Sequence, residues 1–472
     1  MWRRAVSSWL ANAPSHPATE IPSPRGLPII GTTLDLIAAG GAPRLHEYVD
    51  ARHRQLGPIY RESIGPVNGV FVADPNEMRR VFTLEGKYPK HILPDAWVLY
   101  NKMYGSKRGL FFMNGEEWLH FRRIMNRHWL MPGSGYEVIG PCDFVATELV
   151  DRWTRKYNGR EVIGLESELY RWAIKITVAV LMGDKYSKNQ QRIEDMVEHF
   201  TSFIRLIFQE SARLSLIPAT VAEFLKIPAW RNFVSAVDEA LAVANSLISV
   251  LMPECQNGEG LLGALLAEEI EHNDVVRIMV DLCIAAGDTI ASSIQWMMYL
   301  LARNPDLQDE LNAELLEVHR PEDIVQLPLV RGTMREALRL YPVAPFLSRY
   351  MPEDSMIGGY RVPSGDLILL SIYTSGHDAR NFPEPDRFWP QRWTRDADGN
   401  YKGVSNPFAS LPFAMGARSC IGRRIAETQL TLTVAKVIQK FKLELIEKKP
   451  VDMMLRLVAV PSRPVRLWLT ER

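Results

Sequence analysis

Cysteine is scarce in this sequence, with four residues in a chain of 472. Cys142, Cys255, Cys283 and Cys420 are far apart and include no C-x-x-C pair. This spacing argues against a disulfide framework and a zinc site, and it fits a reducing compartment. An excess of either charge is also missing, because the formal net charge is +0. Nucleic acid is therefore not expected as a partner, and any charge-driven docking must use a local patch.

Long hydrophobic runs, linkers and repeats are missing as well. No stretch reaches the roughly 18–20 uncharged apolar residues that span a bilayer, and 241–252 is apolar but too short. No Gly/Ser linker, low-complexity tract or internal repeat divides the chain, although its length exceeds the usual limit of about 250–300 residues for one core. We therefore expect one catalytic domain over residues 26–472, preceded by a leader over residues 1–25.

The leader has two interpretations. Residues 1–19 contain Arg3, Arg4, serines and alanines, and no acidic residue precedes Glu20. This composition is typical of a mitochondrial transit segment, and it fits an ordinary disordered terminus equally well. The proline-rich segment 22–28 that follows should not be helical.

Local patterns predict an α+β fold that is predominantly helical, with small peripheral β-sheets. Strands are expected at 59–64 and 69–73, and Asp74-Pro75 predicts the start of a helix. The pattern from 115 to about 305 is largely helical. Strand patterns return within 351–370, 455–460 and 465–469, and a long helix is expected from Cys420 to about residue 441.

A loop around Cys420 carries the most specific motif. Residues 413–422 read Phe-Ala-Met-Gly-Ala-Arg-Ser-Cys-Ile-Gly. Gly416 and Gly422 permit a close approach of the backbone to a ligand, and a helix that begins just after Cys420 aims its positive end at the sulfur. Most lone cysteines are buried structural residues, but F-x-x-G-x-R-x-C-x-G specifies five positions. This pattern resembles the signature of the haem-thiolate monooxygenases, the cytochromes P-450.

The resemblance implies a single haem-thiolate monooxygenase fold that binds haem b. Cys420 would be the metal ligand, as the axial thiolate of the haem iron. Phe413 would shield the sulfur, and Arg418 would pair with a haem propionate.

Further segments carry the same resemblance. Trp118 and Arg122 match the family's W-x-x-x-R, and residues at i and i+4 share a helix face, so both can reach one propionate. Alone, this pair would more often be a core tryptophan beside a solvated arginine. By the same resemblance, Arg349 would be another propionate partner.

The family's E-x-x-R corresponds to Glu336 and Arg339, which lie at i,i+3 on one helical face. Taken alone, such a pair is a common surface ion pair. By the resemblance it pairs with Arg392 and stabilises the core on the haem side, a structural role rather than a catalytic one.

Asp288-Thr289 lies inside a long helical pattern from about 273 to 302, roughly 45 Å at about 1.5 Å per residue. An acid–alcohol pair in an apolar helix is costly unless it is used, so both are catalytic candidates that would relay protons. Ala285, Ala286 and Gly287 would leave room for O2. Ala286 stands where the family commonly has glycine, and Ile290 replaces a frequent second hydroxyl residue.

The segment 420–426, Cys-Ile-Gly-Arg-Arg-Ile-Ala, resembles the mitochondrial branch of the family. That branch is associated peripherally with the matrix side of the inner membrane, and we expect a monomer. Arg331 and Arg335 would dock a [2Fe–2S] ferredoxin of the adrenodoxin type, which passes on electrons from NADPH. A solvated basic helix face is the alternative.

The closest resemblance is to arthropod ecdysteroid 2-hydroxylases. It rests on residues 31–41, 48–53, 93–97, 108–113, 341–346 and 450–456. It implies hydroxylation of 2-deoxyecdysteroids at C2 in moulting-hormone biosynthesis. The implied substrate-binding residues are Trp97, Ala285, Val343, Ala344, Phe346 and Met454. A haem-thiolate isomerase or dehydratase, and a non-enzymatic haem sensor, are the alternative hypotheses.

Overall fold

The structure, a computed structural model, describes residues 20–130, 138–215, 217–255, 258–268 and 270–472. Most of the expected leader, 1–19, lies outside the described residues. Residues 20–28 form no helix, as their prolines predict.

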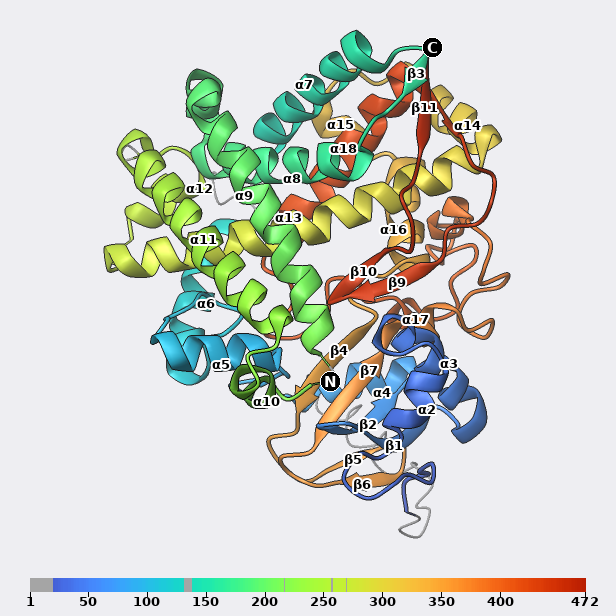
Figure 1. The fold of residues 1–472 in the computed structure, drawn as a ribbon. Helices are drawn as coiled ribbons and strands as arrows, with labels where there is room; N and C mark the ends of the chain where they lie inside the picture. Colours follow the sequence, from blue (N-terminus) through green and yellow to red (C-terminus); the bar gives the residue numbers. More distant parts are fainter. Residues whose placement is uncertain (1–19, 131–137, 216, 256–257, 269) are drawn as a thin grey trace, which may run out of the picture.

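A four-stranded sheet combines two strands from the amino-terminal part of the chain with two strands from residues 346–371 (Figure 1). Its strand order is β1 (Ile59–Ile64), β2 (Val67–Val72), β7 (Leu367–Ser371) and β4 (Phe346–Tyr350). Only the β2–β7 pair is parallel. The strand predicted at 59–64 has these bounds in the structure. The second strand begins at Val67 rather than residue 69, because Gly65, with φ of 57°, lets the chain turn within two residues.

Three helices accompany this sheet: α2 (Thr33–Ala38), α3 (Leu45–Leu56) and α4 (Pro75–Thr83). The predicted start of α4 is confirmed. The Asp74 carboxylate accepts hydrogen bonds from the amides of Asn76 at 2.9 Å and Glu77 at 3.0 Å, while Pro75 fills the first helical position.

The rest of the described chain is mainly helical. The remaining α-helices are α5 (Asp95–Tyr104), α6 (Gly115–Trp129), α7 (Ile139–Tyr157), α8 (Leu165–Met182), α9 (Tyr186–Leu214), α10 (Ala219–Phe224), α11 (Pro228–Leu251), α12 (Gly260–Leu266), α13 (His272–Ala302), α14 (Pro305–Leu316), α15 (Pro321–Ile324), α16 (Pro328–Leu340), α17 (Ile372–Gly376) and α18 (Arg423–Lys440).

Helix α13 crosses the middle of the helical body (Figure 1). It has 31 residues, and buried side chains occupy every part of it beyond the first turn. It packs against α8, α11, α16 and α18. The long helix predicted over about 273–302 is therefore the central element of the core.

Short strands complete the described fold. β3 (Arg160–Glu161) lies beside β11 (Leu467–Glu471), which pairs with β8 (Phe441–Leu445). The other two-stranded pairs are β5 (Ser355–Ile357) with β6 (Tyr360–Val362), and β9 (Met453–Arg456) with β10 (Val458–Pro461). The predominantly helical α+β class with small peripheral sheets is confirmed.

By length and composition, the described residues contain one helix that could cross a membrane, Pro228–Cys255. Its buried side includes Phe233, Val237 and Leu247. Its other side exposes polar residues such as Ser235 and Asn245. The helix is therefore amphipathic, with an apolar stripe packed against its neighbours and a polar face on the opposite side.

Candidate active site

Cys420 lies in a tight loop immediately before α18. Its amide donates to the carbonyl of Phe413 at 2.9 Å, and the Ser419 amide donates to the carbonyl of Gly416 at 3.2 Å. Gly416 has φ of 80°, a left-handed angle that favours glycine. Because α18 begins at Arg423, its amino-terminal end lies next to the sulfur.

Cys420 is exposed, although the protein atoms around its thiol exclude enough water to raise the thiol pKa. The Gly422 amide, which hydrogen-bonds the sulfur, and then the charge of Arg122 lower the thiol pKa in opposition to burial, so these groups favour the thiolate that metal binding requires.

Near its centre, helix α13 leaves one face accessible. Ala285 is exposed and Thr289 is half-buried, although Ile284, Asp288 and Ile290 between and beside them are buried. The Thr289 hydroxyl donates to the Ala285 carbonyl at 2.8 Å. Ala285 and Thr289 are four residues apart and therefore share this accessible face of α13.

Asp288 points into a different environment from Thr289. Its side chain is buried, and its Oδ2 has no hydrogen-bond partner among the described residues. Burial, and then the negative charge of Glu166, raise the pKa of Asp288 well above its usual range. Burial therefore favours the protonated form of this carboxyl group, which can donate a hydrogen bond.

The expectation that Gly287 opens space for O2 is wrong. A Cβ on Gly287 would lie 3.0 Å from Ile174 Cδ1 and 3.3 Å from Ile204 Cδ1. Gly287 therefore lets α8 and α9 approach α13 closely, on the side away from Ala285 and Thr289.

Buried cationic groups gather beside the Cys420 loop. Arg349 Nε donates to Glu85 at 2.6 Å, Arg122 Nη2 donates to Ser419 Oγ at 3.3 Å, and the Arg418 guanidinium lies 4.5 Å from the centre of the Trp118 ring. Burial, followed by the charges of Arg349 and Arg122, lowers the pKa of Arg418 to about 10.

This cluster fits the two propionates of haem b. Its three guanidinium groups and the single Glu85 carboxylate leave two positive charges in excess. One nitrogen on each of Arg122, Arg349 and Arg418 is buried without a partner among the described residues. An anion that accepts from these donors would offset the cost of burying them. The fold thus brings Trp118, Arg122, Arg349 and Arg418 together as a candidate haem-binding set.

Sequence reasoning missed two members of this cluster. Glu85 bonds both Arg349 and the Ala417 amide. His91 is half-buried, and desolvation followed by the charges of Arg418 and Arg349 lowers its pKa to about 3. Neither residue lies in a motif, and both reach the site only through long-range contacts.

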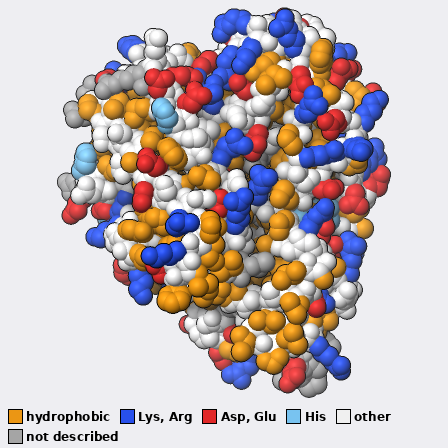
Figure 2. All heavy atoms as spheres, in the orientation of Figure 1, with side chains coloured by type: hydrophobic (Ala, Val, Ile, Leu, Met, Phe, Trp, Pro, Cys, Tyr) orange, Lys and Arg blue, Asp and Glu red, His pale blue; other side chains and the backbone are white. Residues whose placement is uncertain are grey.

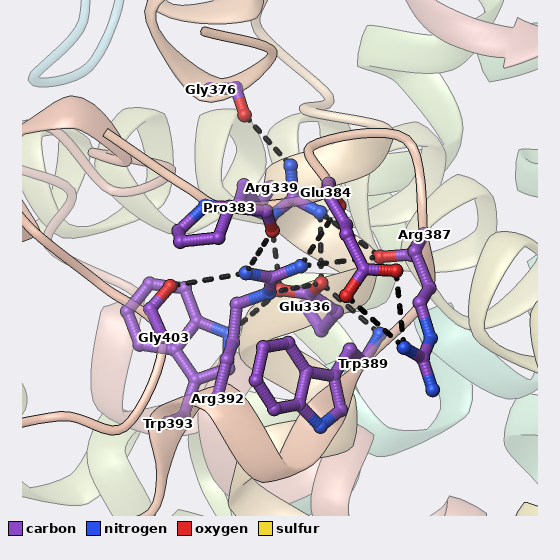
Figure 3. Close-up of polar contacts among 10 residues, drawn as sticks. All are labelled: Glu336, Arg339, Gly376, Pro383, Glu384, Arg387, Trp389, Arg392, Trp393 and Gly403. Atoms are coloured by element: carbon purple, nitrogen blue, oxygen red, sulfur yellow. Dashed lines mark hydrogen bonds and ion pairs between the residues drawn. The ribbon is translucent and has the colours of Figure 1, made fainter. Parts of the chain in front are cut away.

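Glu336, Arg339 and Arg392 form a buried ionic network (Figure 3). Glu336 Oε1 accepts from Arg339 Nη2 at 2.8 Å and from Arg392 Nε at 2.7 Å. Glu336 Oε2 accepts from Arg339 Nε and Trp393 Nε1, both at 2.9 Å. The remaining guanidinium donors reach backbone carbonyls of Gly376, Pro383, Glu384 and Gly403. Such a satisfied network fixes α16 to the loops before Cys420.

The expected substrate residues lie on separate elements. Trp97 is buried on α5, with its ring 5.3 Å from that of Phe233. Val343, Ala344 and Phe346 are half-buried, and the Val343 carbonyl accepts from the Ala459 amide at 2.9 Å. That bond ties the 341–346 segment to β10, whose partner strand β9 carries the half-buried Met454.

Arg331 and Arg335 lie on α16 and are half-buried. Arg331 Nη1 donates to Gln326 Oε1 at 3.2 Å, and Arg335 Nη1 donates to the Tyr401 hydroxyl at 3.1 Å. Within the part of the chain that the structure describes, neither forms an ion pair with a carboxylate, so both keep an uncompensated positive charge.

Comparison with known proteins decides the family. Residues 21–469 match the Cytochrome P450 family. The chain belongs to the cytochrome P450 family. It is 40% identical to Cytochrome P450 315a1, mitochondrial, of Drosophila melanogaster, over 97% of this chain and 90% of that protein. It is 31% identical to the mitochondrial cholesterol side-chain cleavage enzyme of Oncorhynchus mykiss, over 91% and 86%. The retinoic acid bound cyanobacterial CYP120A1 shares the fold, with a TM-score of 0.78 and 21% identity over 97% of this chain and 100% of that one.

As a P450, the protein is a haem-dependent monooxygenase that uses O2. Its relatives place it in the mitochondrion, where P450 enzymes receive electrons through a ferredoxin. The predicted enzyme class, haem b cofactor and mitochondrial location are confirmed. When bound, the haem supplies the chemistry that inserts one atom of O2 into the substrate and releases the other as water.

Proposed function

We propose that this P450 hydroxylates a 2-deoxyecdysteroid at C2, in the biosynthesis of moulting hormone. The proposal rests on the position, within the fold, of the segments that resemble ecdysteroid 2-hydroxylases. Residues 93–97, 341–346 and 450–456 include Trp97, Val343 and Met454, which line buried or half-buried surfaces around the helical core. Sterol-like substrates are also named for two relatives, the cholesterol side-chain cleavage enzyme and the 25-hydroxyvitamin D-1 alpha hydroxylase of Mus musculus.

Three groups of residues would hold the haem and the loop that carries its ligand. Cys420 would hold the iron as a thiolate, and Phe413 would cover the sulfur. Trp118, Arg122, Arg349 and Arg418 would hold the propionates and so fix the orientation of the ring. Glu336, Arg339 and Arg392 would keep the loop before Cys420 in place.

Proton delivery would use the pair on α13. Burial raises the pKa of Asp288 and so favours the protonated carboxyl group, which can donate a proton. The Thr289 hydroxyl lies on the open side of α13 and is already oriented by its bond to Ala285. Thr289 would hold and pass the proton at the open face, and Asp288 would resupply it through a change of side-chain position.

The substrate side would be apolar. At Ala285 the accessible face of α13 carries no large side chain. The residues that would contact the steroid are Trp97, Val343, Ala344, Phe346 and Met454. These groups would exclude water and orient one edge of the ring system toward the iron. An isomerase that rearranges peroxides would need neither Asp288-Thr289 nor an electron donor.

The electron donor would be a [2Fe–2S] ferredoxin of the adrenodoxin type. Arg331 and Arg335 carry uncompensated charge on α16, the helix whose Glu336 network anchors the segment that leads to Cys420. An acidic partner at this position would lie on the thiolate side of the haem.

We also propose that the enzyme is a monomer associated peripherally with the inner membrane. Large apolar side chains are exposed at Phe224 (80%) and Leu225 (62%), at the end of α10, and at Ile29 (95%). Hydrophobic side chains also gather on the lower half of the face in Figure 2. Flotation with liposomes that contain cardiolipin tests this point, and Phe224→Ser with Leu225→Ser should reduce the bound fraction.

Product analysis tests the proposed reaction. The holoenzyme is incubated with 2-deoxyecdysone, NADPH, ferredoxin reductase and ferredoxin, and products are identified by mass spectrometry against authentic ecdysone. We expect ecdysone, in amounts that depend on NADPH. Hydroxylation at another carbon would overturn the C2 assignment, whereas turnover without NADPH would favour the isomerase alternative.

A further inference from the structure

Glu85 joins two elements of the site that are distant in the sequence. It follows α4, and its side chain is 5% exposed. Its Oε2 accepts from Arg349 Nε at 2.6 Å, and its Oε1 accepts from the Ala417 backbone amide at 2.5 Å. The first partner is on β4 and the second is in the Cys420 loop, so one carboxylate connects the sheet to the thiolate loop.

The backbone of the loop is shaped around this carboxylate. A Cβ at Gly416 would lie 2.2 Å from Glu85 Oε1, closer than any side chain can approach. Gly416 also has φ of 80°. A side chain at position 416 would therefore displace the Glu85 carboxylate from its present position, and the positive φ independently favours glycine there.

The charge of Glu85 acts on the whole arginine cluster. Its negative charge raises the pKa values of Arg122 and Arg418, in opposition to burial. It also reduces the excess positive charge of the three arginines to the value that two propionates neutralise. Without Glu85, the loaded site would keep one buried positive charge with no partner.

We propose that Glu85 is a positioning residue that holds Arg349 and the Cys420 loop in register and matches the charge of the arginine cluster to the two haem propionates. This role concerns the haem site and is independent of the steroid that the enzyme oxidises. Glu85 touches neither the iron nor the substrate, and it acts through Arg349 and Ala417.

Two substitutions separate the effect of the Glu85 charge from the effect of its side-chain length. Glu85→Gln keeps the size but removes the charge, and its single oxygen can accept from only one of the two donors, Arg349 Nε and the Ala417 amide. Glu85→Asp keeps the charge but is one methylene shorter. Glu353→Gln is a matched control, because Glu353 is an exposed carboxyl only four residues beyond Arg349.

The measurements are the reduction potential of the haem and the rate of haem transfer to excess apomyoglobin, both on purified holoenzyme. For Glu85→Gln we expect a more positive potential, because removal of a nearby negative charge favours the reduced iron. We also expect haem loss to be about tenfold to hundredfold faster, the range for loss of a charged hydrogen bond. Glu85→Asp should lose haem faster with a potential close to that of the wild type.

A folded Glu85→Gln variant with the potential and haem-loss rate of Glu353→Gln would overturn the proposal. A potential that moves equally in Glu85→Asp and Glu85→Gln would also overturn it, because the charge would then have no role. If Glu85→Gln does not fold, Glu85→Asp decides alone: haem loss at the wild-type rate would overturn the proposal, and faster loss at an unchanged potential would support it.

Discussion

Arg108 and Asp281 form a buried ion pair that ties the segment before α6 to the first half of α13. Arg108 Nε donates to Asp281 Oδ1 at 2.8 Å, and the Gly109 amide donates to Oδ2. The Arg108 guanidinium lies 4.6 Å from the centre of the Trp97 ring and 5.0 Å from that of Phe112. This pair therefore supports one wall of the proposed steroid site.

Asp281→Asn should destabilise the protein and weaken steroid binding. The neutral amide would leave the buried Arg108 charge without a partner, a change that costs about 3–5 kcal/mol. Urea unfolding of the holoenzyme measures the stability, and the steroid-induced spectral shift measures binding. Asp274→Asn, which affects the more exposed pair with Arg277, is the control and should change stability by less than half as much.

Cys420→His should retain some haem but lose thiolate ligation. The reduced carbon monoxide complex should then lack the red-shifted Soret band of the wild type. Cys283→Ala, which removes a buried thiol from α13, should keep that band. Retention of the band in Cys420→His would contradict the assignment of the ligand.

Much of this site could be predicted because its motifs are local. Cys420, Arg418 and Gly416 share one loop, and Glu336 and Arg339 are three residues apart. Glu85 and His91 could not be predicted in the same way. Glu85 meets Arg349 and Ala417 across 264 and 332 residues, and only the folded chain reveals these pairs.

The fold was predictable to a similar extent and for similar reasons. The start of α4 could be predicted from Asp74-Pro75, because an N-cap depends only on neighbouring residues. The parallel pairing of β2 with β7 joins strands from opposite parts of the chain, which no local pattern contains. The error at Gly287 was avoidable, because residues at i and i+4, such as Ala285 and Thr289, share a helix face that residue i+2 does not.

Thr289→Ala should bind steroid but divert electrons into hydrogen peroxide. Proton-delivery groups typically contribute about 10²–10⁴-fold, so product formed per NADPH should fall more than NADPH consumption does. Ser293→Ala is a close control, since its hydroxyl makes the same bond one turn further on, to the Thr289 carbonyl at 2.8 Å. Equal coupling in Thr289→Ala and the control would show that another group delivers the proton.

Asp288→Asn should stabilise the protein at neutral pH. Because the folded-state pKa of Asp288 is raised by burial, the folded chain binds its proton more tightly than the unfolded chain does. The stability from this group is thus fully present below the unfolded pKa of about 3.9 and is lost as pH rises toward the folded pKa.

Thermal unfolding from pH 4 to pH 8 measures this effect. The gain of Asp288→Asn over the wild type should be small at pH 4 and should grow as pH rises. Asp398→Asn, at an exposed position, is the control for removal of one acidic charge, and at pH 8 the gain of Asp288→Asn should exceed the change that it gives. A gain that is constant across the range would mean that Asp288 titrates normally in the fold.

Reversal of the charges on α16 should weaken the ferredoxin interaction. Arg331→Glu with Arg335→Glu should raise the ferredoxin concentration needed for half-maximal turnover, because an acidic partner would then meet like charge. Steroid binding, measured by the spectral shift, should change little. The difference from the wild type should shrink as salt rises, because salt screens the attraction between the two protein surfaces with a Debye length of about 8–10 Å near physiological salt.

The matched control for this experiment is Arg54→Glu with Arg320→Glu, which makes the same change of charge at side chains that are 77% and 74% exposed. If the control matches the wild type at low salt while the α16 variant needs more ferredoxin, the effect belongs to α16 and not to net charge. Arg335 also lies 5.8 Å from the Trp393 ring, so haem content and thermal stability must be measured alongside. A folded α16 variant with full haem content and a wild-type ferredoxin titration at low salt would show that the partner docks elsewhere.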